Sequence, residues 1–145
     1  MQDLPHHYAV AAAAETQGDV TLATEGVADL PSAPPVEFGG PGGRWSPESL
    51  LVAAVADCFV LSFRAIARAS KLPWTRVHCA VSGTLDRVEG KTRFTAFQLH
   101  AKLVTPQDVD GDKAVRLLEK AEASCLITNS LSAQTHLTTE VVTGD

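Results

Sequence analysis

Cysteine is scarce in this sequence of 145 residues, which contains only Cys58, Cys79 and Cys125. No two of them form a C-x-x-C pair, and this excludes a structural zinc ribbon. The N-terminus also lacks the basic segment and the apolar stretch of a signal peptide. A small, odd number of cysteines without a signal peptide argues against a secreted disulfide scaffold. We therefore expect a cytoplasmic protein whose thiols are either buried or reactive.

Positive charge is missing from the N-terminal part of the chain, where no lysine or arginine precedes Arg44. The whole chain has a formal net charge of −5, and its basic residues form no dense patch. We therefore expect neither nucleic acid nor a membrane surface as a partner.

Long apolar runs are missing as well. The longest covers residues 50–56 and ends at Asp57, well short of the ~20 residues that span a bilayer. The sequence therefore predicts no membrane-spanning helix. The hydrophobic content of 45% is ordinary for a globular protein, and the length predicts a single domain over residues 1–145.

The N-terminal part of the chain predicts strands followed by a loop. Residues 7–29 contain two or three short strand patterns separated by turn residues. Residues 31–45 are so rich in proline and glycine that we expect no regular structure there.

A long helix is predicted from Ser46 to Ser70. Ser46 can cap its N-terminus, Pro47 suits the first helical position, and Pro73 prevents its extension. Residues 50–63 are apolar on nearly every side of this helix, and such a helix is buried on every side. A domain of this size has little material to cover it, which suggests a second subunit.

The rest of the sequence predicts a hairpin, a second helix and a last strand. Two strands with period-two alternation cover residues 74–89 and 92–105. An amphipathic helix follows over residues 111–124, then a short turn, then a strand over residues 135–142. Strands grouped in hairpins predict an α+β fold with antiparallel sheets around the long central helix.

Cys58 and Cys125 are the candidate reactive residues. Cys58 lies in the middle of the apolar helix beside Asp57, and Cys125 lies where the second helix ends. Either thiol could equally be a packing residue, as free cysteine often is. Cys79 alternates with valines on one strand face, so we assign it to the core. Glu48 is too far along the helix to reach Cys58 of the same chain, so any contact with a thiol site would involve a partner subunit.

A metal or organic cofactor is not predicted. The acidic segment 108–112 lacks the glycine and glutamate positions of a calcium loop. The histidines show no ligand spacing, and none is paired with Cys58 by the sequence.

Two blocks of sequence resemble the OsmC/Ohr family. The first, GGPGGRWSPESLLVAAVADCF at residues 39–59, contains a glycine-rich loop, a Pro-Glu helix start and a cysteine ten residues after that glutamate. The second, AEASCLITNSLS at residues 121–132, places a cysteine at a helix end before a polar turn. The order of the elements agrees from about residue 8 to residue 142, and the match is closer to the general OsmC-like branch than to the organic-hydroperoxide-resistance branch.

The resemblance implies an intertwined homodimer and a thiol-dependent peroxidase that needs no cofactor. Cys58 would attack an organic hydroperoxide and become a sulfenic acid. Cys125 would resolve it as a disulfide, and an external dithiol would reduce that disulfide. The thiolate needs a cation because burial raises its pKa, and Arg44, beside Glu48, is the nearest candidate.

Apolar side chains near these positions could hold the tail of a hydroperoxide, although each could equally belong to the core. They are Phe38, Trp45, Leu51, Val55 and Phe59. A binding module for a small apolar ligand, with inert or redox-sensing thiols, is the main alternative function. A hydrolase that uses Cys58 as an acyl nucleophile is a third, and it would require a histidine near that thiol.

Overall fold

The computed structural model describes residues 1–144, which form two compact units. The first is Met1–Leu50, and the second begins at Leu51. The first unit contains an antiparallel sheet in the order β1-β2-β3. Its strands are β1 (Ala11–Ala13), β2 (Val20–Ala23) and β3 (Leu30–Ser32). The prediction of short N-terminal strands is confirmed.

The proline- and glycine-rich segment is more regular than predicted. It contains most of β3 and a 3₁₀ turn, η1 (Val36–Phe38). Pro31 is tolerated because β3 is an edge strand of its sheet. Gly40 is required here by space, since a Cβ at that position would lie 1.7 Å from the Pro34 carbonyl oxygen. The expectation of no regular structure was wrong.

The long helix α1 (Pro47–Ala69) closely follows the prediction. The Ser46 hydroxyl accepts a hydrogen bond from the Ser49 N–H at 3.1 Å, and the Ser49 hydroxyl accepts one from the Ser46 N–H at 2.9 Å. This reciprocal cap satisfies two backbone donors at the helix start. α1 is long and apolar enough to meet the criteria for a membrane-spanning helix. The prediction of no such helix, which rested on the short apolar run at residues 50–56, was therefore too strict.

The hairpin of β4 (Arg76–Val88) and β5 (Lys91–Thr105) is confirmed. Its turn consists of Glu89 and Gly90, both with positive φ, which matches the right-handed twist of the paired strands. α2 (Gly111–Ala123) follows, and the Asp110 side chain caps it by accepting from two backbone N–H groups.

The last strand, β6 (Gln134–Thr143), pairs in parallel with β5. The prediction of purely antiparallel pairing was therefore wrong for this strand. A parallel pair needs a crossover of a dozen or more residues, and α2 and α3 (Leu126–Asn129) provide it. The sequence predicted only a turn where α3 forms.

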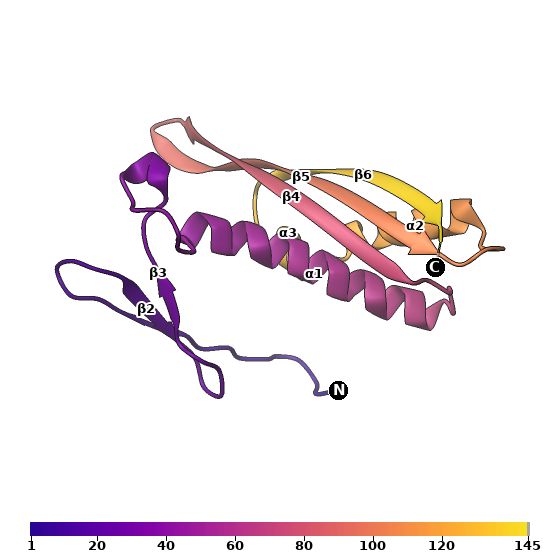
Figure 1. Ribbon diagram of the computed structural model, residues 1–145, viewed down its shortest axis with the longest axis horizontal. Coiled ribbons are helices and arrows are strands. Elements are labelled where there is room, and N and C mark those ends of the chain that lie inside the picture. Colours follow the sequence, from indigo (N-terminus) through magenta and orange to yellow (C-terminus); the bar gives the residue numbers. More distant parts are fainter. Residues whose placement is uncertain (145) are drawn as a thin grey trace. The chain divides into compact units, whose positions relative to one another are not determined.

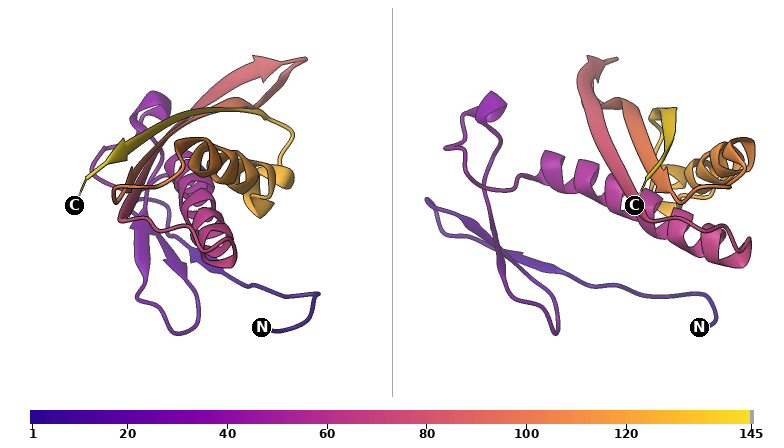
Figure 2. Two further views of the ribbon diagram at one scale, coloured as in Figure 1. Left: turned by 90° about the vertical axis from the view of Figure 1, so that its right-hand side faces the viewer. Right: turned by 45° about the vertical axis from the view of Figure 1, so that its right-hand side comes forward.

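The core of the second unit lies between the sheet β4-β5-β6 and the helices α1 and α2, which cover one face of that sheet (Figures 1 and 2). α1 contributes a single stripe to it, namely Val55, Phe59, Phe63 and Ala67. Leu61, on another side of α1, is 50% exposed. The expectation of a helix buried on every side is therefore not met within one chain, and a second subunit stays a prediction.

Candidate thiol site

The candidate site begins with Cys58, a half-buried residue near the middle of α1. Ser62 lies one turn later on the same face, because residues four apart on a helix are neighbours. The Cys58 sulfur and the Ser62 hydroxyl oxygen are 3.9 Å apart. Asp57 is exposed, so its carboxylate faces solvent, where it needs no partner in the core.

The second half of the site is the start of α3, where Cys125 is the N-cap residue. Cys125 is 1% exposed. Its carbonyl oxygen accepts hydrogen bonds from the Asn129 N–H at 3.0 Å and from the Thr128 hydroxyl at 3.3 Å. These bonds hold the Cys125 backbone in one orientation. The first N–H groups of α3 have no partner within the helix, so they can donate to a neighbouring group.

The neighbour that these groups face is Cys58. Partial burial raises the pKa of the Cys58 thiol, but hydrogen bonds oppose this effect, and the net pKa is lower than the usual value. The donors are the Ile127 N–H, the Cys125 thiol, the Ser62 hydroxyl and the Leu126 N–H. Hydrogen bonds to the charged form favour that form, so this arrangement favours the Cys58 thiolate.

This outcome corrects one expectation from the sequence. Burial was expected to raise the Cys58 pKa unless a cation lay nearby. In the structure the start of α3 supplies hydrogen bonds instead. Sequence reasoning missed Leu126 and Ile127 because α3 was not predicted, whereas the spacing of Ser62 from Cys58 could have indicated its role.

Cys79 behaves differently from Cys58. It lies on β4 and packs against the core, as predicted. Burial and the neighbouring Cys125 raise the pKa of Cys79 to about 11. A thiol with this pKa is almost entirely protonated at neutral pH and is a poor nucleophile.

Glu48 and Arg44, the other predicted catalytic residues, lie in the Met1–Leu50 unit. Within residues 1–144, the Glu48 Oε1 atom is buried and has no hydrogen-bond partner. The Arg44 guanidinium Nε lies 2.9 Å from the Asp19 Oδ2 atom, and this ion pair is largely exposed. The roles of both residues at a thiol site stay predictions.

The predicted substrate-pocket residues are divided between two environments. Phe38 and Glu48 line an apolar hollow of about 460 Å³ in the first unit, together with residues of β2 and the prolines 34 and 35. Val55 and Phe59 are fully buried in the core of the second unit, and Leu51 packs against that core. Core packing therefore explains those three side chains without a ligand. Trp45 is 48% exposed.

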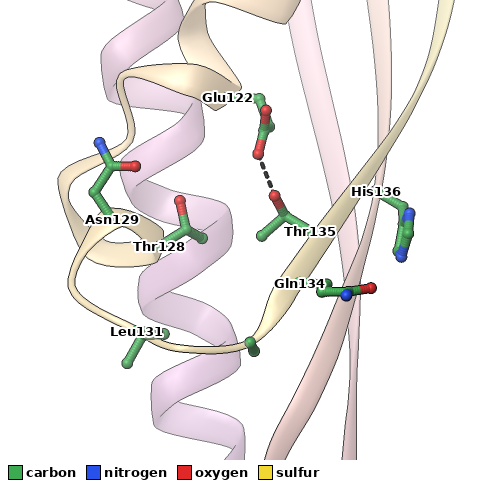
Figure 3. Close-up of a pocket in the computed structure, with 8 residues that line it drawn as sticks. Glu122, Thr128, Asn129, Leu131, Gln134, Thr135 and His136 are labelled. Atoms are coloured by element: carbon green, nitrogen blue, oxygen red, sulfur yellow. Dashed lines mark hydrogen bonds between the residues drawn. The ribbon is translucent and has the colours of Figure 1, made fainter.

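A second hollow, of about 490 Å³, lies beside α3 and the start of β6 (Figure 3). The Thr135 hydroxyl donates a hydrogen bond to the Glu122 carboxylate at its edge, and His136 lies further along β6. In the part of the chain that the structure describes, no three histidine, cysteine or acidic side chains could hold a metal ion together.

The features described so far define an α+β protein with two neighbouring thiols at the junction of a long helix and a short one. Residues 40–140 match the family model described as OsmC-like protein. The chain therefore belongs to the OsmC-like family, as the resemblance indicated.

Similar proteins agree with this assignment. An uncharacterized protein of Bacillus subtilis, YmaD, is 26% identical over 109 residues, which are 73% of each chain. An OsmC-like protein of unknown function from Vibrio cholerae has a TM-score of 0.84 at 17% identity, covering 95% of this chain and 100% of its own. An organic hydroperoxide resistance protein from Legionella pneumophila has a TM-score of 0.75 at 26% identity, covering 97% of this chain and 99% of its own.

Proposed function

We propose that the protein is a thiol-dependent peroxidase that reduces organic hydroperoxides through Cys58 and Cys125. The observation that carries the proposal is the start of α3, whose N–H groups and Cys125 thiol lower the pKa of Cys58. A thiolate is the nucleophilic form of cysteine. The similarity to the Legionella protein, an organic hydroperoxide resistance protein, supports the substrate class.

The reaction proceeds in three balanced steps. The Cys58 thiolate attacks the distal peroxide oxygen, the O–O bond breaks, and the alkoxide leaves and takes up a proton to become an alcohol. Cys58 is now a sulfenic acid. The Cys125 thiol attacks this sulfur, a disulfide forms, and water leaves. An external dithiol reduces the disulfide by exchange and is itself oxidised.

The proposal includes a homodimer. Glu48 presents a buried carboxylate oxygen that has no partner within residues 1–144, and a buried polar atom without a partner is costly. Leu61 exposes half of its side chain on α1. In the proposed dimer, a second copy of the chain donates a hydrogen bond to the Glu48 carboxylate and covers the exposed Leu61 side chain. Arg44 is the cation proposed to act with Glu48. In this proposal Arg44 leaves its exposed partner Asp19 and pairs with Glu48 instead.

A turnover assay tests this function. Purified protein is mixed with cumene hydroperoxide and an excess of dithiol, and peroxide loss is followed over time. The proposal predicts multiple turnovers by the wild type and none by Cys58→Ser. Cys79→Ser is the matched control and should retain activity, because its thiol is not needed. Equal rates in the wild type and Cys58→Ser would overturn the proposal.

A second candidate function is the binding of a small apolar ligand. The apolar hollow that contains Phe38 favours it, because its volume of about 460 Å³ suits a small molecule. Absence of turnover, together with an apolar compound that copurifies with the protein, would favour this function. The hydrolase hypothesis has less support, since the hydrogen bonds given to Cys58 within residues 1–144 come from no histidine.

A further inference from the structure

A third hollow, with a positively charged rim, lies in the second unit at the C-terminal end of α1. Its volume is about 620 Å³, and Arg64, Arg68, Lys71, Leu72 and Trp74 are among the residues that line it. We call it the basic hollow. The volume falls within the range of small-molecule sites. The thiol chemistry does not use it, and core packing accounts for only its apolar lining residues Ala67, Leu72 and Trp74.

Within residues 1–144, no ion pair joins the cations of the basic hollow to an acidic side chain. Arg64, Arg68 and Lys71 are all exposed, and the ion pair found within residues 1–144 joins Arg44 to Asp19 instead. Lys113 adds a fourth cation at this end of α1, where its ammonium donates to the Ser70 carbonyl at 3.3 Å. Like charges around one hollow repel each other, so an anion bound there would relieve the repulsion.

Stabilisation of the helix dipole explains only part of this cluster. Cations favour the last turn of a helix, which accounts for Arg68. It does not account for Lys71, whose φ of 55° is left-handed. The Leu72 N–H donates to the Ala67 carbonyl at 3.0 Å, and the Lys71 N–H donates to the Arg68 carbonyl at 3.2 Å. This is the helix end at which glycine is strongly preferred, so a lysine at this position lowers the stability of the fold.

Trp74 gives the basic hollow an apolar wall. It is partly buried and packs edge-on against Phe63, with ring centroids 5.5 Å apart and an interplanar angle of 72°. The buried Leu72 lies beside it in the lining. Cations next to an aromatic ring and an aliphatic side chain are complementary to a molecule with an anionic head and an apolar body.

We propose that the basic hollow is a binding site for an organic anion, which carries a carboxylate or phosphate head on an apolar body. Arg64, Arg68 and Lys71 bind the head, and Trp74 contacts the body. The site does not depend on the chemistry of Cys58, so failure of the peroxidase assay leaves this proposal standing.

The test uses Trp74 fluorescence in a Trp45→Phe background, in which Trp74 is the only tryptophan of the chain. The probes are phenyl phosphate, benzoate, inorganic phosphate and phenol. We expect saturable quenching by phenyl phosphate or benzoate, and weaker binding of inorganic phosphate and phenol. The stronger of the two organic probes identifies the head group. Calorimetry on the unaltered chain checks the same affinity, and high salt should weaken it because the contacts are exposed.

Three variants, one of them a control, separate binding from folding. Arg68→Gln should weaken the affinity for the organic anion about fivefold or more. Arg87→Gln, on the distant hairpin, should leave this affinity unchanged. Lys71→Gly should weaken binding and at the same time raise the melting temperature, because glycine is favoured at this helix end. A purely structural role for Lys71 would not produce opposite changes in these two readouts.

Three results would overturn the proposal. The first is the absence of saturable binding by either organic anion. The second is equal weakening by Arg68→Gln and Arg87→Gln, which would indicate non-specific attraction to positive charge. The third is equal affinity for inorganic phosphate and phenyl phosphate, which would exclude a contact between the ligand body and Trp74.

Discussion

Cys125 is a neighbour of Cys58 whose thiol helps to lower the Cys58 pKa, although α2 and the whole β4-β5 hairpin separate them in the sequence. α3 begins immediately after Cys125, so the same short segment supplies a neighbouring thiol and two backbone donors. One element therefore both activates Cys58 and presents the group that would resolve its oxidised form. The following predictions test this arrangement and the fold that supports it.

Alkylation of Cys58 and Cys79 should depend differently on pH. The thiolate reacts and the thiol does not, so a lowered pKa moves the reactive range of Cys58 to lower pH. Cys79, with a pKa of about 11, should stay unmodified at neutral pH. Iodoacetamide labelling at a series of pH values, followed by peptide mass mapping, measures both residues. Faster labelling of Cys79 than of Cys58 at pH 7 would contradict the structure.

Ser62→Ala should reduce the reactivity of Cys58 without abolishing it. The variant removes one donor at 3.9 Å from the sulfur, a long contact that contributes less than an ordinary charged hydrogen bond. We expect a loss of about two- to threefold in the alkylation rate at pH 7, from about 0.5 kcal/mol. The midpoint of the pH profile should rise. Ser82→Ala, at an exposed position of β4, is the matched control and should change neither value.

Gly83→Ala should destabilise the second unit. A Cβ at Gly83 would lie 2.9 Å from Phe94 and 3.1 Å from Phe97, and these two rings are stacked with centroids 5.3 Å apart. Overpacking of this kind costs about 1–3 kcal/mol. Gly111→Ala meets open space at the start of α2 and should be neutral or slightly stabilising. Urea unfolding of both variants measures the difference, and equal midpoints would show that the stacked rings can move aside.

Leu61→Asp should shift the protein from dimer to monomer. The side chain is 50% exposed on α1 within one chain, and a second copy is proposed to cover this helix. A charge buried at such an interface is unfavourable. Light scattering coupled to size exclusion gives the mass, and circular dichroism checks the fold. A wild type that is monomeric at all concentrations would remove the dimer from the proposal.

The boundaries of α1 could be predicted from the sequence because its signals are local. Ser46 and Pro47 mark its start, and Pro73 prevents its extension. α3 could not be predicted, since one helical turn has no hydrophobic period to detect. The parallel pairing of β6 was also missed, because the choice of a neighbouring strand depends on the path of α2 and α3 rather than on the alternation within β6.

The two thiols of the candidate site could be named from the sequence, but the backbone groups that donate to Cys58 could not. Cys58 and Cys125 were candidates from their positions in the sequence, and the family resemblance assigned their roles, whereas nothing local to either cysteine predicts that they meet. Half of the donors that lower the Cys58 pKa are backbone N–H groups, and every residue except proline has one. Their effect arises from where the chain turns, so side-chain identity alone could not reveal it.

The most direct test of the two-cysteine mechanism is intact mass and thiol count before and after one equivalent of cumene hydroperoxide. The wild type should lose the mass of two hydrogens and two free thiols, with Cys58 and Cys125 joined and Cys79 still free. Cys125→Ser should instead gain one oxygen at Cys58, and Cys58→Ser should not react. Three unchanged thiols in the wild type, or a disulfide that includes Cys79, would contradict the mechanism.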